Sequence, residues 1–277
     1  MNAAELLEEK IFSPPEVFLK LRDTMDDPNH TFTDLEKIIE ADPVLAARLL
    51  KISNSVFYGF ETKVESIKHA LSVIGSEPLT NLVLSATVSD NFRTIPKELV
   101  DMEAFWKHSL ACAIAAKFLA ELKNEPDTDS YYLAGLLHDI GSLVIYSELP
   151  QKAIAAIEHS SKTGEHLYNS ENQIIGFCHA GMGGALFNDW KLPKKVVDGV
   201  RYHHTPLLAK EYPEFCAYMH IAEVTSSRTK FGRRDEQKER PFAPDILEKF
   251  NVSPKEIELI QSKLEESVEE IFQLFFG

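Results

Sequence analysis

The sequence predicts an all-α protein, and three observations support this prediction. Apolar residues recur at three- and four-residue steps through most of the chain, which is the spacing of one helix face. Helix-start signals occur at several places, such as the proline in Asp42-Pro43, which suits a first helical position. Strand patterns are scarce, since even the apolar run Leu143-Val144-Ile145 stands in a context that favours helix.

The first part of the chain is expected to form several short helices. They begin at Thr33-Asp34, at Pro43, near Val64 and at Pro78, and they end near Ile39, Asn54-Ser55, Gly75 and Asn91. The stretch Arg93–Glu98 that follows is polar and contains Pro96, so we expect a domain boundary there.

The helices after this boundary begin with residues 105–122. The Ser109–Ala116 portion of that helix is entirely small or apolar, as expected of a central helix packed on several sides. Further helices are expected at about 130–138, 150–162, 177–189, 193–204 and 213–228.

The C-terminal part combines a charged segment with one more helix. Arg228–Pro241 is expected to be a solvated loop, although five basic residues within Arg228–Lys238 could contact an anionic partner. Ser253-Pro254-Lys255-Glu256 is a capping box that opens an acidic amphipathic helix through Ile271. This helix could form a dimer interface or cap its own domain. We therefore expect three parts: 1–97, 98–230 and 231–277.

Net charge, cysteine spacing and apolar runs argue against several functions and locations. The net charge of −14 disfavours general binding to nucleic acid, because it repels polyphosphate backbones. The spacing of Cys112, Cys178 and Cys216 fits neither a disulfide framework nor a zinc knuckle. Because the first ten residues resemble no secretory signal and no apolar run reaches about 18 residues, we expect a cytoplasmic protein without a membrane span.

The most informative motif is His138-Asp139 within Gly-Leu-Leu-His-Asp-Ile-Gly at 135–141. It places a neutral nitrogen ligand beside a carboxylate that has two oxygens with which to bridge metal ions. Further histidines stand on apolar helix faces or at helix ends, at His108, His179 and His203-His204, and Glu223 follows His220 by one turn. Burying so many rings without partners is costly, so either a metal site or a dense hydrogen-bond network is expected. The chain lacks the nucleophile elbow and the phosphate-binding glycine loop of other enzyme classes.

These residues resemble the HDOD family, a bacterial branch related to the HD superfamily of metal-dependent phosphohydrolases. The resemblance covers roughly residues 10–228. In the first half it rests on Ala41-Asp42-Pro43, Leu49-Leu50, Asn54-Ser55, Tyr58-Gly59, Ile67, Ala70 and Gly75. In the second half it rests on Trp106 to Ser109, Gly135 to Gly141, Gly176 to His179, Trp190, Leu192-Pro193 and His203-His204.

The resemblance implies an N-terminal helical bundle packed on an HD-like helical domain, and a role in bacterial signal transduction. It also implies one or two divalent ions (Fe, Mn, Mg or Zn). Their ligands at matching positions would be His108, His138, Asp139, His179, His203, His204 and, where the superfamily has an aspartate, Glu223.

Three departures from the catalytic pattern argue against simple phosphohydrolysis. Ser142 stands where the related cyclic-dinucleotide phosphodiesterases called HD-GYP carry a lysine, Thr205-Pro206 replaces their Gly-Tyr-Pro continuation, and Glu223 is longer than aspartate. Lys194, Lys195 and Arg201 could substitute as phosphate contacts, but solvent-facing helix charges are the simpler interpretation.

Two main functional hypotheses follow, and a purely structural interaction domain without a ligand is a third. The first is a regulatory module of weak or no catalytic activity whose site binds a metal or a small nucleotide-type ligand, and which acts on a signalling protein partner, as a monomer or a homodimer. The second is an active metal-dependent phosphohydrolase acting on a nucleotide or cyclic dinucleotide, in which Asp139 would be a catalytic residue.

Overall fold

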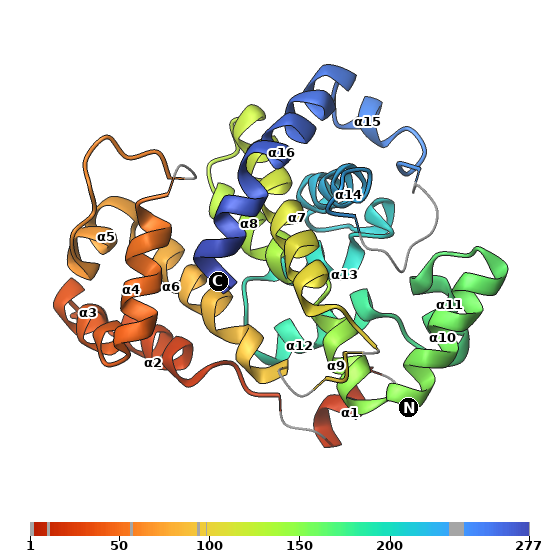
Figure 1. Ribbon diagram of the computed structural model, residues 1–277, viewed down its shortest axis with the longest axis horizontal. Coiled ribbons are helices and arrows are strands. Elements are labelled where there is room, and N and C mark those ends of the chain that lie inside the picture. The colour runs from red at the N-terminus through yellow and green to blue at the C-terminus, as the bar shows by residue number, and fades with distance from the viewer. Residues whose placement is uncertain are drawn as a thin grey trace. The chain divides into compact units, whose positions relative to one another are not determined.

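The computed structural model describes residues 3–9, 12–55, 58–92, 95–97, 99–232 and 241–276. Every regular element among these residues is a helix, and none of them lies in a strand (Figure 1). The all-α prediction is therefore confirmed. None of the helices in this part of the chain is long and apolar enough to cross a membrane.

The chain divides into two compact units, each of which is discontinuous in sequence. The larger unit comprises Met1–Phe12 and Thr94–Glu266, and the smaller comprises Ser13–Arg93 and Ser267–Gly277. The expected domains 1–97, 98–230 and 231–277 are three continuous ranges and do not correspond to these two discontinuous units. That division stays a prediction.

The smaller unit is a set of short helices around an aliphatic core that includes Leu35, Leu49, Ile52 and Leu71. Asp42 caps one of them by accepting hydrogen bonds from the N–H groups of Val44 and Leu45. The helices are α2 (Glu16–Met25), α3 (Phe32–Glu40), α4 (Pro43–Ser53), α5 (Ile67–Ile74), α6 (Ser76–Thr87) and the 3-10 helix η1 (Val88–Phe92).

The larger unit is built around α7, which is buried along most of its length and packs on α8 and α14. Helix α12 packs on α9 and α13, and α10 packs on α11. Its helices are α1 (Ala3–Glu9), α7 (Met102–Leu122), α8 (Thr128–Leu137), α9 (Ile140–Glu148), α10 (Pro150–Thr163), α11 (Leu167–Ile174), α12 (His179–Asp189), α13 (Lys194–Tyr202), the 3-10 helix η2 (Pro206–Leu208), α14 (Pro213–Ser227) and α15 (Ile246–Lys249). The last helix, α16 (Pro254–Phe276), begins in this unit.

Several helix ends differ from those expected, and capping explains two of the differences. The helix expected near Val64 begins at Ile67, because the Ser66 side chain accepts the N–H of His69 and so forms the N-cap. The helix expected at 105 begins at Met102, because Asp101 caps it through the N–H of Ala104. Helices α1, α2, α11 and α15 are additions that the apolar spacing did not predict, and α9 was expected only as a helical context around Leu143 to Ile145.

Glycines let the helices of the larger unit approach closely. A Cβ atom built on Gly135 would lie 2.6 Å from the Cα atom of Ala113, so α8 contacts the backbone of α7 there. A Cβ on Gly141 would lie 2.1 Å from the carbonyl oxygen of His179. Gly183 and Gly184 also admit close neighbours, as expected, whereas Gly181 meets nothing nearer than 3.9 Å. The close contacts hold α8 against α7 and α9 against α12.

The charged segment Arg228–Pro241 is described only at its two ends, and residues 233–240 lie outside the described part of the chain. At the described ends the guanidinium of Arg228 lies 4.4 Å from the ring centroid of Phe242. The capping box of α16 is confirmed, since the N–H of Ser253 donates to Glu256 at 2.7 Å and the N–H of Glu256 donates back to the Ser253 hydroxyl.

Candidate metal centre

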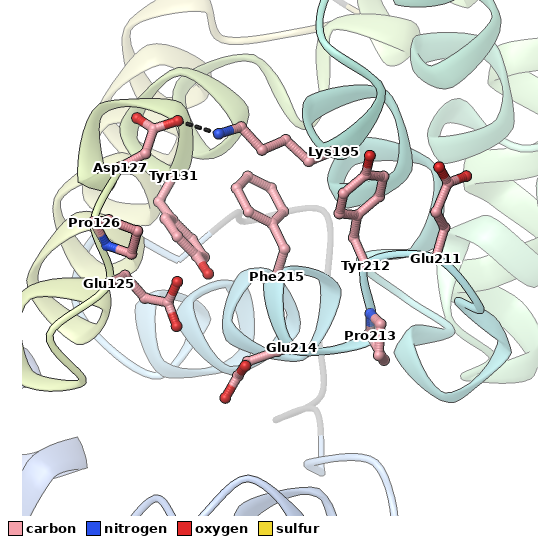
Figure 2. A pocket seen from close by; sticks show the side chains of 10 residues that line it. All are labelled: Glu125, Pro126, Asp127, Tyr131, Lys195, Glu211, Tyr212, Pro213, Glu214 and Phe215. Carbon is pink, nitrogen blue, oxygen red and sulfur yellow. Dashed lines mark hydrogen bonds and ion pairs between the residues drawn. The ribbon is translucent and has the colours of Figure 1, made fainter.

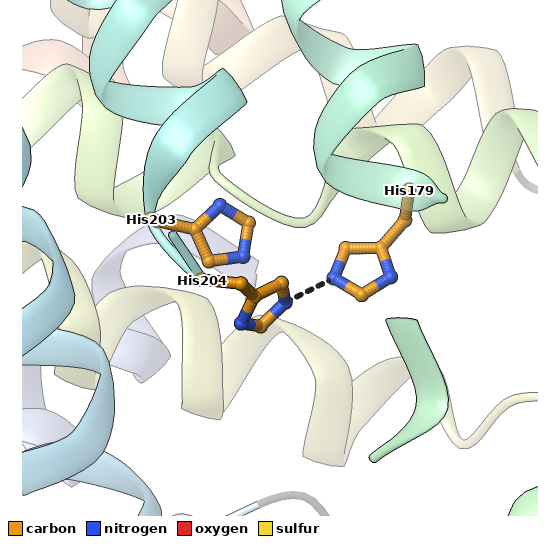
Figure 3. Close-up of side chains that lie close together, drawn as sticks. All are labelled: His179, His203 and His204. Carbon is orange, nitrogen blue, oxygen red and sulfur yellow. Dashed lines mark hydrogen bonds between the residues drawn. The ribbon is translucent and has the colours of Figure 1, made fainter. Parts of the chain in front are cut away.

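The seven ligands that the family resemblance implies converge in the larger unit, and we call this set the His–Asp centre. His108 comes from the middle of α7, and His138 and Asp139 form the whole connection between α8 and α9. His179 is the first residue of α12, His203 and His204 directly follow α13, and Glu223 lies in α14. Six of these side chains are buried, and His204 is half-buried at the edge. Figure 3 shows the three histidines from α12 and the end of α13 facing one another.

Asp139 lies between two groups of ligands. Its Oδ2 atom is 3.4 Å from Nε2 of His138, and its Oδ1 atom is 3.3 Å from Nε2 of His179. On the His138 side, Glu223 Oε2 lies 2.9 Å from Nε2 of His108 and 3.1 Å from Nε2 of His138. The groups His108–His138–Glu223 and His179–His203–His204 could each hold an ion, and a third candidate group, His138–Asp139–His203, overlaps both. A carboxylate placed between two such groups is suited to bridging two metal ions.

The ring orientations fix which nitrogen faces the centre. In His108, His138 and His203 the Nδ1 atom lies within hydrogen-bond distance of a backbone carbonyl, and in His179 it lies 2.6 Å from the Glu171 carboxylate. Because carbonyl and carboxylate oxygens only accept hydrogen bonds, Nδ1 carries the proton in all four rings. Each Nε2 atom is thereby left to face the centre, which is the arrangement found around protein-bound metals.

Unsatisfied atoms test whether a cation fits this site. The buried Nε2 atom of His203 makes no hydrogen bond among the described residues, and Oδ1 of Asp139 is 3.8 Å from it. Buried polar atoms are rarely left in this state, because each one costs about 1–3 kcal/mol. A polar network alone would have paired this atom, whereas a divalent ion would accept its lone pair. The donor set of imidazoles and carboxylates therefore fits a metal ion of the Zn, Fe or Mn type.

Opposing charges shift the pKa values within the centre. Burial disfavours the charged form of His138, but the charges of Asp139 and Glu223 outweigh burial and hold the pKa of His138 well above its ordinary value. Burial would raise the pKa of Glu223, yet the charges of His108 and His138 hold it well below its ordinary value. Burial, helped by the charge of His138, keeps the pKa of His203 well below its ordinary value. In the absence of an ion, a proton on His138 therefore neutralises part of the carboxylate charge.

Two functional residues were missed by the sequence interpretation. Glu171, in α11, is buried and accepts both the backbone N–H and the Nδ1–H of His179, at 2.8 and 2.6 Å. His220, in α14, lies 2.7 Å from the carbonyl oxygen of His203 through its Nδ1 atom. A signal existed for His220, one turn before Glu223, whereas Glu171 stands alone in a polar segment and gave none.

The basic residues considered as phosphate contacts lie away from the His–Asp centre or are engaged elsewhere. Lys194 pairs with Asp198 at 3.0 Å, and Lys195 pairs with Asp127. Lys195 precedes His203 by eight residues, which is about 12 Å along a helix axis. The side chain of Arg201 packs against Gly184. Their role as phosphate contacts stays a prediction.

Lys195 lies instead on a pocket of about 300 Å³ at the first turns of α8, α13 and α14 (Figure 2). Its wall includes a stacked pair of rings, Tyr131 and Phe215, with centroids 4.1 Å apart. Around these rings stand the carboxylates of Glu125, Asp127, Glu211 and Glu214. The acidic lining makes this pocket unsuited to a phosphate group.

The departures from the catalytic pattern also have places in the structure. Ser142 is fully buried in α9, and its hydroxyl has no hydrogen-bond partner in the described part of the chain. Thr205 closes the turn after α13 through its N–H to the Tyr202 carbonyl, and Pro206 begins η2. Neither residue supplies a positive charge near the centre.

Comparison with known proteins supports the architecture. An uncharacterized protein of Treponema pallidum (strain Nichols) is 26% identical over 216 residues, which are 76% of this chain and 41% of that protein. The chain thus spans about two fifths of the length of this relative. An HDOD domain protein of unknown function from Geobacter sulfurreducens superposes with a TM-score of 0.75 at 22% identity, covering 99% of this chain and 98% of that one. A proposed phosphohydrolase from Shewanella amazonensis gives a TM-score of 0.74 at 23% identity, with coverage of 99% and 98%.

At these identities the two solved structures establish the fold alone. The family model of the HDOD domain, in contrast, matches residues 11–206, well over half of the chain and most of the His–Asp centre. The chain belongs to the HDOD domain family.

Proposed function

We propose that this chain is a regulatory HDOD module whose His–Asp centre holds one or two divalent metal ions. The observation that carries the proposal is the convergence of the Nε2 atoms of His138, His179 and His203 on Asp139, while Nε2 of His108 faces Glu223 beside them. In all four rings the Nδ1 atom is already engaged. Rings held in this way lose little further conformational freedom when an ion binds, so the site is preorganised for a metal.

The chemistry of the donor set narrows the choice of ion. Imidazole nitrogen favours Zn and Fe, and the carboxylates of the centre suit Mn, whereas Mg prefers oxygen ligands and retains several waters. With His179, His203 and His204 on one side of Asp139 and two histidines with Glu223 on the other, we expect a transition metal at each position.

The charges around the centre support regulation rather than efficient catalysis. Phosphoryl transfer requires cations that neutralise developing charge on the phosphate oxygens. Lys194 and Lys195 are instead paired with Asp198 and Asp127, and Ser142 supplies a hydroxyl where related enzymes have a lysine. Burial of six of the seven ligands also restricts the room for a substrate at the ions. A bound ion or small ligand would then stabilise one arrangement of helices that a signalling partner recognises.

The alternative function is metal-dependent phosphohydrolysis of a nucleotide or cyclic dinucleotide. The placement of Asp139 between two ligand groups favours it, because pairs of bridged ions activate water in phosphodiesterases. In this case Asp139 would bind both ions. His204, at the half-buried edge, would lie nearest to an incoming substrate. The phosphohydrolase proposed in Shewanella amazonensis has the same fold.

Metal analysis combined with a hydrolysis assay tests both functions. Purified protein is reconstituted with Mn²⁺, Fe²⁺ or Zn²⁺, bound metal is measured by mass spectrometry, and turnover of bis(p-nitrophenyl) phosphate and of a cyclic dinucleotide is followed. We expect one or two ions per chain, little turnover, and loss of the ions in Asp139→Asn. Asp129→Asn is the matched control, because Asp129 pairs with Lys117 outside the centre.

Each other outcome has a defined meaning. Turnover that depends on the metal and disappears in Asp139→Asn would favour the phosphohydrolase over the regulatory module. Failure of the wild-type protein to bind any of the three metals would refute both functions. Metal loss in Asp129→Asn as great as in Asp139→Asn would show that the assay reports general destabilisation rather than ligation.

A further inference from the structure

Helix α11 touches the His–Asp centre with two side chains that are not among the expected ligands. Tyr168 and Glu171 are three residues apart, so they lie on the same face of this helix. Tyr168 contacts His204, and Glu171 contacts His179. These two histidines belong to one of the two ion-binding groups.

Glu171 controls the orientation of His179. Its side chain is 1% exposed, and its Oε2 atom accepts the N–H and the Nδ1–H of His179, while its Oε1 atom has no hydrogen-bond partner among the described residues. Gly176 makes this contact possible, because its φ of +101° turns the chain between α11 and α12. Burying a carboxylate this deeply costs free energy unless it has a defined partner, and its partner here is His179.

The carboxylate gives His179 a property that the neighbouring ligands lack. The Nδ1 atoms of His108, His138 and His203 face backbone carbonyls, which are neutral. Since the partner of His179 is a carboxylate rather than a neutral carbonyl, its Nε2 atom becomes the stronger metal donor. Ion binding on this side of Asp139 therefore depends on Glu171.

Tyr168 controls the ring of His204. The two rings are stacked, with centroids 4.6 Å apart and planes 14° from parallel. His204 is half-buried, so packing from other sides restrains it less than it restrains the buried ligands. In this orientation its Nε2 atom is hydrogen-bonded to Nε2 of His179 at 2.7 Å, and an ion bound by both rings would replace this hydrogen bond (Figure 3).

We infer that Glu171 and Tyr168 are positioning residues that set the ion affinity of the His179–His203–His204 group. Helix α11 thereby governs one of the two ion positions and leaves the His108–His138–Glu223 group unaffected. This inference rests on the proposed function, because it assigns a role toward the ions that the centre is proposed to hold.

Isothermal titration with Mn²⁺ and Zn²⁺ tests the inference on the full chain. Glu171→Gln keeps the shape and a hydrogen-bond acceptor but removes the charge, and Tyr168→Phe keeps the stacking ring that Tyr168→Ala removes. Gln173→Ala is the control, because Gln173 lies exposed on the same helix and bonds to Glu165. We expect Glu171→Gln and Tyr168→Ala to weaken one ion position about 10-fold or more and to leave the other within twofold, while Tyr168→Phe and Gln173→Ala match the wild type.

A second measurement separates this inference from the proposed function. In metal-free protein labelled with ¹⁵N-histidine, the Nδ1–H resonance of His179 is expected to move in Glu171→Gln and not in Gln173→Ala. If the wild type binds no metal, the proposed function fails, yet this resonance still tests the positioning role of Glu171. The inference is overturned if the resonance stays in place in Glu171→Gln, or if both Glu171→Gln and Tyr168→Ala bind two ions as tightly as Gln173→Ala.

Discussion

His220 holds the backbone of the candidate ligand His203, with its Nδ1 atom 2.7 Å from the His203 carbonyl oxygen. The N–H of Ala243 donates to the other ring nitrogen of His220 at 2.9 Å. Since the carbonyl accepts a hydrogen bond and the amide donates one, His220 is a neutral imidazole protonated on Nδ1. It therefore acts on the His–Asp centre from outside it, as a support rather than a ligand.

Replacement of His220 by alanine is predicted to weaken metal binding about 10-fold while leaving the ligands intact. The His203 carbonyl would lose its donor, and the turn that carries His203 and His204 would become less restrained. Titration with Zn²⁺ measures the effect. The control is His69→Ala, which changes a histidine of the smaller unit. Equal affinities in the two variants would contradict a supporting role for His220.

Metal affinity is predicted to rise with pH near neutrality. The charges of Asp139 and Glu223 overcome burial and raise the pKa of His138, so the metal-free protein carries a proton on its Nε2 atom. This proton stabilises the metal-free fold at low pH, and its contribution is lost as the pH rises through the raised pKa. An ion must displace the proton. Calorimetry in buffers of different ionisation enthalpy should therefore show proton release on binding at pH 7, and no release would contradict the assignment.

Gly141→Ala is predicted to destabilise the protein by about 3 kcal/mol, because the new methyl group would meet the backbone of α12 at His179 and Gly183. Gly181→Ala in α12 is the matched variant, since its methyl group would meet nothing nearer than 3.9 Å. It is predicted to stabilise the helix by about 0.5–1 kcal/mol. Chemical denaturation measures both, and similar stability of the two variants would show that α9 and α12 are not in tight contact.

Glu256→Ala is predicted to destabilise the larger unit by about 1–2 kcal/mol. Glu256 accepts hydrogen bonds from the backbone and hydroxyl of Ser253 and pairs with Lys123 at 2.7 Å, so it joins the start of α16 to the end of α7. Glu258→Ala removes an exposed carboxylate from the same helix and should change stability by less than about 0.5 kcal/mol. Thermal unfolding compares the two variants, and equal melting temperatures would contradict the role of Glu256 in joining α16 to α7.

Local sequence signals were sufficient for most of the helices. Asp42-Pro43 and the Ser253 to Glu256 box mark helix starts that the structure confirms, because capping is decided by residues three or four positions apart. The signal failed for α1, α2, α11 and α15. Helix α11 has a polar surface with only Leu167, Ser170 and Glu171 buried, so its apolar spacing was too weak to detect.

The candidate ligands could be named from sequence because motif and spacing identify them, but their supports could not. Glu171 reaches His179 through a turn at Gly176, and the partner of His220 is a carbonyl in a different helix connection. Both contacts depend on how α11, α12, α13 and α14 pack. Nothing in a one-dimensional pattern distinguishes a buried glutamate that orients a ligand from an exposed one.

The pairing of His108 with Glu223 has a consequence for folding kinetics. These residues are 115 positions apart in sequence, yet their side chains are 2.9 Å from each other. Closing so long a loop is slow, and the donors of an ion come together only when α7 and α14 have already docked. An ion would therefore arrive after the rate-limiting step and leave the folding rate unchanged. It would act by slowing unfolding, so that a loaded chain is distinguished from an empty one chiefly by how long it persists in its folded state.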